Sequence, residues 1–183
     1  EEDKDRMIST IGPFWDANET WIVLGVGVLL MAFPRAHGVV LTALYAPVTI
    51  MLIGLTLRGV AFDFRVKAKS KYKKTWSKLF FLGSFAAATA QGWMLGHYVM
   101  GLSQTAFSIA FSAVIALMLP ILYIMLGAGW VLVKTEGDLY RRAATWARWF
   151  VLPLGIGFFL ISIATPLAST EIAEKWLSLP EAI

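Results

Sequence analysis

The chain alternates between long apolar stretches and short charged ones. Five apolar stretches follow one another, at residues 14–33, 39–57, 79–101, 107–133 and 143–164. Each is close to or longer than the roughly 20 residues that a helix needs to cross a bilayer core of about 30 Å. No stretch alternates with period two, as a transmembrane β-strand does. The pattern predicts an all-α, polytopic transmembrane helix bundle with five spans within residues 14–164.

Composition supports this membrane assignment. Hydrophobic residues make up 58% of the 183 residues, charged residues 15%, and the mean hydropathy is +0.68. Soluble domains contain about 45–50% apolar residues. The chain has no cysteine, which excludes disulfides, thiolate nucleophiles and cysteine-based metal sites within it. The charged residues 1–13 lack the apolar core of a signal peptide, so we expect insertion to depend on the internal spans.

Basic residues predict the orientation in the membrane. Of the 16 lysines and arginines, 14 fall on one side if five spans alternate, and only Arg35 and Lys175 fall on the other. By the positive-inside rule that side is cytoplasmic. We therefore expect a cytoplasmic tail at 1–13, basic cytoplasmic loops at 58–78 and 134–148, and a C-terminal segment at 165–183 on the outer side. The loop 58–78 is interpreted as a topology determinant beside anionic lipid headgroups, with no nucleic-acid partner.

Two carboxylates near the start of the first span are candidates for chemistry. Pro13 fits the first turn of a helix, and Asp16 and Glu19 fall at the positive end of its dipole. A carboxylate just inside a hydrocarbon slab must be paired, hydrated or protonated, which favours a functional role. Asp16 is the leading candidate, and Glu19, three residues on, can share its proton. Alternatively, Trp15 and Trp21 are interfacial anchors, which is the commoner use of tryptophan at the end of a span.

An arginine lies at the same predicted depth as Asp16. At 1.5 Å per residue, Arg58 on the returning helix reaches the same cytoplasmic level. Arg58 can neutralise Asp16. Alternatively, Arg58 can pair with Asp63, and this second pairing requires the helix to end near Gly59. A nearby opposite charge lowers a carboxylate pKa and burial raises it, so a cluster balancing both can accept and release protons. A static ion pair joining two helix ends is the alternative.

Other motifs offer little chemistry. His97 is the only histidine inside a span, so a bis-histidine haem site lacks its second ligand, and His97 is interpreted as a hydrogen-bonded packing residue. We identify no cofactor-binding or metal-binding residues in this chain. Gly92 and Gly96 form a Gly-xxx-Gly pair, which indicates a close helix contact.

Four stretches together resemble subunit II of the bacterial cytochrome bd-type quinol oxidases. Their order and spacing match the family over nearly the whole chain. They are Gly12–Trp21 (GPFWDANETW), Arg58–Arg65 (RGVAFDFR), Gly83–Gly92 (GSFAAATAQG) and Leu126–Leu139 (LGAGWVLVKTEGDL).

The resemblance implies part of a larger assembly. Members of this family have eight spans, of which this chain is similar to the second to sixth, so we do not expect it to be active alone. The implied complex lies in the bacterial inner membrane, with 165–183 in the periplasm. It oxidises ubiquinol or menaquinol, reduces dioxygen to water and takes protons from the cytoplasm, generating a membrane potential. The pair Gln91 and Gly92 resembles the cyanide-insensitive branch.

The resemblance also implies where the chemistry resides. Subunit I carries haem b, haem d and the quinol site, and subunit II carries no haem. Subunit II contributes to a cytoplasmic proton path and stabilises subunit I. The positions here that match the path are Asp16, Trp21, Arg58 and Asp63, of which Trp21 is assigned by the resemblance alone.

Two other functions are alternatives. A small-molecule or ion transporter would need polar residues or broken helices near mid-bilayer, and the span centres here are nearly all apolar. A purely structural membrane scaffold for the partner subunit is compatible with the sequence.

Overall fold

The structure of this chain is a computed structural model that describes residues 2–12, 14–168 and 173–174, without the side chains of 15–19 and 168. Its seven main elements in this part of the chain are all helices. They are α1 (Glu2–Ile11), α2 (Trp15–Ala32), α3 (Pro34–Ala43), α4 (Tyr45–Lys67), α5 (Ser70–Val99), α6 (Ala106–Lys134) and α7 (Asp138–Ala168).

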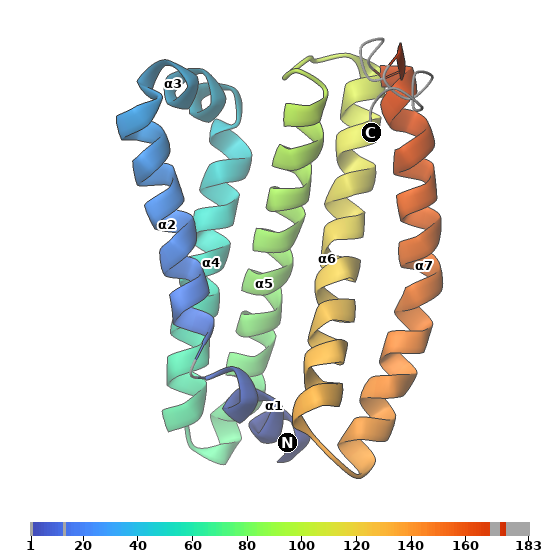
Figure 1. The fold of residues 1–183 in the computed structure, drawn as a ribbon. Helices are drawn as coiled ribbons and strands as arrows, with labels where there is room; N and C mark the ends of the chain where they lie inside the picture. Colours follow the sequence, from blue (N-terminus) through green and yellow to red (C-terminus); the bar gives the residue numbers. More distant parts are fainter. Residues whose placement is uncertain (1, 13, 169–172, 175–183) are drawn as a thin grey trace.

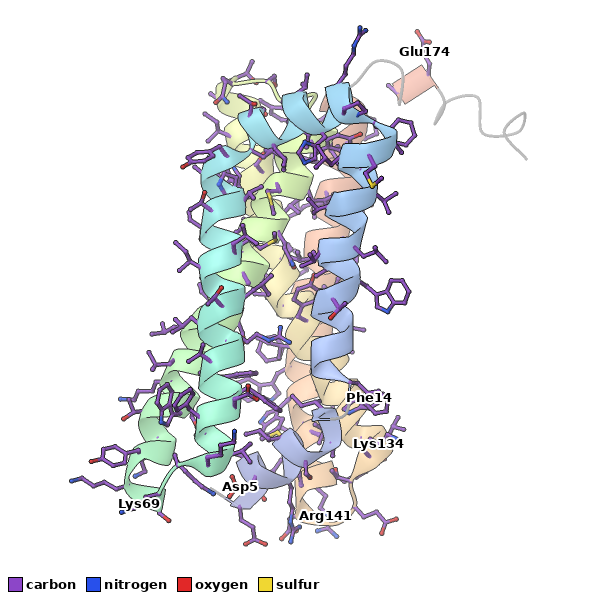
Figure 2. All side chains as sticks on the ribbon, turned by 90° about the vertical axis from the view of Figure 1, so that its left-hand side faces the viewer. Asp5, Phe14, Lys69, Lys134, Arg141 and Glu174 are labelled. Carbon is purple, nitrogen blue, oxygen red and sulfur yellow. The ribbon has the colours of Figure 1, made fainter. Side chains whose placement is uncertain are left out.

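Five of these helices run between the two ends of the molecule, and two short ones lie at the ends (Figure 1). α1 lies at the end that holds the α4–α5 and α6–α7 turns, and α3 lies at the opposite end. Asp5, Phe14, Lys69, Lys134 and Arg141 all lie at the first of these ends (Figure 2). We call it the basic end.

The prediction of an all-α polytopic bundle is confirmed. Within the described residues, α4, α5, α6 and α7 are long and apolar enough to cross a membrane. α2, the first predicted span, has 18 residues, and its described apolar part is the shorter Thr20–Ala32. Consecutive helices from α4 to α7 form the close pairs, whereas the main neighbour of α2 is α3.

The connections between the helices are shorter than the predicted cytoplasmic loops. In place of a loop at 58–78, α4 continues to Lys67 and α5 begins at Ser70, so the connection is Ala68 and Lys69. In place of a loop at 134–148, α7 begins at Asp138. Helical hydrogen bonding continues into the headgroup region, where charged side chains remain solvated, whereas hydropathy marks only the part of a helix inside hydrocarbon.

The second predicted span, 39–57, is also displaced. Pro34 begins a separate helix, α3, as proline at a first helical position does. α4 then begins at Tyr45 and carries the span ten residues beyond its predicted end.

Glycines set the distances between the central helices. A Cβ atom on Gly92 would lie 2.6 Å from the carbonyl oxygen of Ile115, and one on Gly96 would lie 2.6 Å from Cα of Ser112, both on α6. A Cβ on Gly83 would lie 2.6 Å from the carbonyl oxygen of Gly54 on α4. The prediction that Gly92 and Gly96 mark a helix contact is confirmed.

Candidate functional site

The structure describes the backbone but not the side chains of the two predicted acids. Asp16 and Glu19 lie in the first turns of α2, which starts just after Phe14 at the basic end (Figure 2). Their side chains lie outside the described residues. Trp21, two residues after Glu19, is 69% exposed. The proposed contact between Asp16 and Arg58 therefore stays a prediction.

Arg58 is half-buried on α4, and its guanidinium carbon lies 5.8 Å from the centroid of the Phe80 ring on α5. Such an approach is an attractive cation–π contact. Asp63 is exposed on the same helix. Because α4 continues to Lys67, five residues separate the two side chains by about 140° around the axis. The alternative pairing of Arg58 with Asp63, which required the helix to end near Gly59, is wrong.

The clearest ionic cluster is one that the sequence analysis did not identify. Arg65 is 3% exposed, and its Nη1 donates to Oδ1 of Asp5 at 2.7 Å. Its Nε donates to Oγ of Ser77 at 2.8 Å. Nζ of Lys73 donates to Oδ2 of Asp5 at 3.0 Å. The carboxylate of Asp5 thus joins α1 to α4 and α5.

This arrangement keeps Asp5 ionised. Hydrogen bonds from Lys73 and then from Arg65 lower the pKa of Asp5 below 3.8, outweighing the partial desolvation of the carboxyl group. A carboxylate held in that way carries no proton at neutral pH. Asp5 is therefore suited to anchoring α1 and unsuited to relaying protons.

Two further contacts fix α1. Nη1 of Arg142 on α7 donates to Oδ2 of Asp3 at 2.6 Å. Met7 packs against the buried cluster of Val131, Leu139 and Ala143 at the α6–α7 turn. The expected tail is thus a docked helix. Acidic residues in its first turn followed by apolar Met7, Ile8 and Ile11 were the sequence signal for it.

Two polar contacts lie deeper in the bundle. Oη of Tyr123 on α6 donates to Oε1 of Gln91 on α5 at 2.9 Å. Near the opposite end, Nε2 of the buried His97 lies 3.2 Å from Nε2 of Gln104, and its ring stacks on Trp93. The interpretation of His97 as a hydrogen-bonded packing residue is confirmed. The described residues include no group of three or more His, Asp or Glu side chains placed to hold a metal ion.

A cavity of about 790 Å³ lies beneath α1, and we call it the basic-end cavity. Residues from α1, α4, α5, α6 and α7 line it. Most of the lining is aromatic or aliphatic, and its basic members are Lys4, Arg65, Lys74 and Lys78.

Comparison with known proteins relates the whole chain to one family. The family described as cytochrome bd terminal oxidase subunit II matches residues 1–182. A cytochrome bd ubiquinol oxidase subunit 2 of Bacillus subtilis is 33% identical over 153 residues, covering 78% of this chain and 45% of the relative. A probable cytochrome oxidase subunit 2 of Haemophilus influenzae is 27% identical over 190 residues, covering 96% of this chain and 48% of that relative.

The cytochrome bd-I ubiquinol oxidase subunit 2 of Escherichia coli is 30% identical over 96 residues, covering 52% of this chain and 25% of that protein. The chain thus spans about half or less of the length of these relatives.

Proposed function

This chain belongs to the cytochrome bd terminal oxidase subunit II family, and from that premise we propose that it is part of the non-haem subunit of a quinol-oxidising, oxygen-reducing membrane complex. The family match over residues 1–182 carries the proposal. Two of the relatives are named as subunits of ubiquinol oxidases. The four apolar spans among the described residues support a place in the membrane. In this proposal that membrane is the bacterial inner membrane.

The oxygen chemistry belongs to the partner in this proposal. Haem b and haem d on subunit I would supply it, together with the site for quinol. The one buried histidine among the described residues, His97, already contacts Gln104 and Trp93, so we assign it no haem. This chain acts by supporting subunit I and by delivering protons.

The proton path begins at the basic end in this proposal. Asp63 is exposed there and can take a proton from water. Asp16 receives the proton at the start of α2 and shares it with Glu19, about one turn deeper. Trp21 is the next residue of the proposed path along α2. Arg58 stabilises the ionised form of Asp16, which lets the acid release its proton again. The half-buried position of Arg58 on α4 supports this role.

The test is Asp16→Asn in the complete complex, because the chain is about half of the relatives' length. Asparagine keeps the shape but carries no exchangeable acidic proton. We expect quinol-driven oxygen consumption to fall by on the order of tenfold or more, since a lost proton-transfer group is costly. Asp138→Asn removes an exposed carboxylate from the same end outside the path and is the matched control.

Haem spectra and subunit stoichiometry separate this role from a scaffold. Loss of turnover with intact haems and intact assembly supports the proton path. Unchanged turnover and proton uptake would exclude Asp16 from it. Loss of the haems together with turnover would favour the purely structural function.

A further inference from the structure

The basic-end cavity has the dimensions of a ligand site. Its volume of about 790 Å³ falls inside the range of roughly 300–1,000 Å³ typical of small-molecule pockets. Its walls include Phe62 of α4, Phe80 of α5 and Trp130 of α6. α1 contributes Met7, Ile8 and Ile11. A cavity with such walls favours a hydrocarbon chain over water.

Two lysines at this cavity lack acidic partners. Lys74 and Lys78 lie one turn apart on α5, and both line the cavity. Like charges at this spacing repel each other. Neither lysine makes an ion pair with any residue that the structure describes. The nearby carboxylate of Asp5 is occupied by Arg65 and Lys73.

We propose that the basic-end cavity binds one anionic glycerophospholipid, with its phosphate between Lys74 and Lys78 and an acyl chain against the aromatic wall. Basic pockets between transmembrane helices on the cytoplasmic side are suited to such headgroups. Both lysines are exposed, so water solvates them when no ligand is bound. A neutral amphiphile gains nothing from their charge, and a free phosphate gains nothing from the apolar walls. Charge and shape together therefore select an anionic lipid.

The lipid also has a structural consequence. Because α1 supplies part of the wall, a bound acyl chain contacts α1, α5 and α6 together. Binding then adds to the ionic contacts of Asp3 and Asp5 in keeping α1 docked. This inference does not depend on the proton path.

The test measures phosphatidylglycerol bound to the complete complex. The complex is stripped of lipid and reconstituted in phosphatidylcholine nanodiscs containing a known fraction of phosphatidylglycerol, and retained lipid is counted by native mass spectrometry. In Lys74→Gln/Lys78→Gln we expect affinity for phosphatidylglycerol to fall by on the order of ten- to thirtyfold. Lys69→Gln/Lys71→Gln removes the same charge from the same surface outside the cavity and should change it little.

A second pair of variants tests the cavity without changing charge. Gly127 lines the cavity and Gly129 does not, and a Cβ atom on either would meet nothing within 4 Å. Gly127→Leu should therefore displace the acyl chain and reduce bound phosphatidylglycerol, whereas Gly129→Leu should retain it.

Three results would overturn the proposal. Equal losses in the two lysine pairs would indicate general attraction to the basic surface. Full retention of phosphatidylglycerol in Gly127→Leu would place the lipid elsewhere. Retention of phosphatidylcholine or of a quinone as strongly as phosphatidylglycerol would show that the headgroup charge does not select the occupant.

Discussion

The acidic side chains at the basic end have different surroundings, and these decide what each can do. Asp5 accepts hydrogen bonds from Arg65 and Lys73, which stabilise its charged form. Asp63 is exposed and makes no ion pair with the described residues. A relay must exchange its proton, so Asp63 remains a candidate for the path and Asp5 does not.

The anchoring role of Asp5 predicts the effect of Asp5→Asn. The substitution keeps the size of the side chain and removes the charge that meets Arg65 and Lys73. Because the carboxylate is partly exposed, we expect a loss of about 1 to 2 kcal/mol in the docking of α1. Hydrogen exchange of the α1 amides should accelerate accordingly.

Glu2→Gln is the matched control for Asp5→Asn. Glu2 pairs with Arg6 at 2.8 Å within α1, and both side chains are well exposed. Such pairs contribute little, so exchange should stay close to that of the unmodified protein. Equal exchange in the two variants would contradict the anchoring role.

The same carboxylate predicts how α1 docking depends on pH. Its pKa in the folded chain is lowered from 3.8, so its contribution to docking is fully present above that pH. The contribution is lost as pH falls through the lowered pKa. We therefore expect α1 to loosen below about pH 3.8, and this step should be absent in Asp5→Asn, with a spin label on α1 as the reporter.

At the scale of single residues, the sequence identified Arg58 as an arginine at the depth of Asp16, but it did not identify the role of Arg65. Depth along a span can be counted from the sequence, which is how Arg58 was found. The Arg65 cluster depends on residues 60 and 68 positions apart along the chain meeting at Asp5. Only tertiary docking of α1 brings them together. The acidic and apolar pattern of residues 2–11 indicates a helix that docks, but it does not indicate which basic residues its carboxylates meet.

At the scale of helices, close backbone approach predicts the cost of adding a methyl group at Gly92. A Cβ there would lie 2.6 Å from the carbonyl oxygen of Ile115, and backbone cannot rotate away as a flexible side chain can. Gly92→Ala should separate α5 from α6 and destabilise the protein by about 1 to 3 kcal/mol. The thermal unfolding midpoint of the purified complex measures this loss of stability.

Gly129→Ala provides the contrast for Gly92→Ala. A Cβ on Gly129 meets nothing within 4 Å, and alanine is the better helix former. The variant should be neutral or slightly stabilising. If both variants melted alike, the close α5–α6 contact would not contribute to stability.

Helix cores were predictable and helix ends were not. Residues 107–133 were predicted as a span, and α6 runs from Ala106 to Lys134, because apolar residues there continue to both ends. α4 and α5 extend well into basic sequence, where hydropathy does not predict the backbone conformation. The break before Tyr45 falls inside an apolar run, so hydropathy did not reveal it either.

At the scale of the whole molecule, two outer helices leave large apolar surfaces. Met31 of α2 is 87% exposed and Trp149 of α7 is 77% exposed. The curated relatives are about twice as long as this chain, so they contain sequence beyond the part that it matches. We propose that these two faces are where the rest of the complex packs, with lipid covering what remains.

The distribution of charge predicts which way the molecule faces. Lys69 lies at the basic end, and Arg35 lies on α3 at the opposite end. Both are exposed, and the chain has no cysteine to give background labelling. By the positive-inside rule, Lys69→Cys should be cytoplasmic and Arg35→Cys should face outward. A membrane-impermeant maleimide should therefore label Arg35→Cys in intact spheroplasts and Lys69→Cys only in inverted vesicles. The proposed proton path starts at the basic end, where Lys69 lies. Reverse labelling would therefore make the path draw protons from the outer side and would refute cytoplasmic uptake.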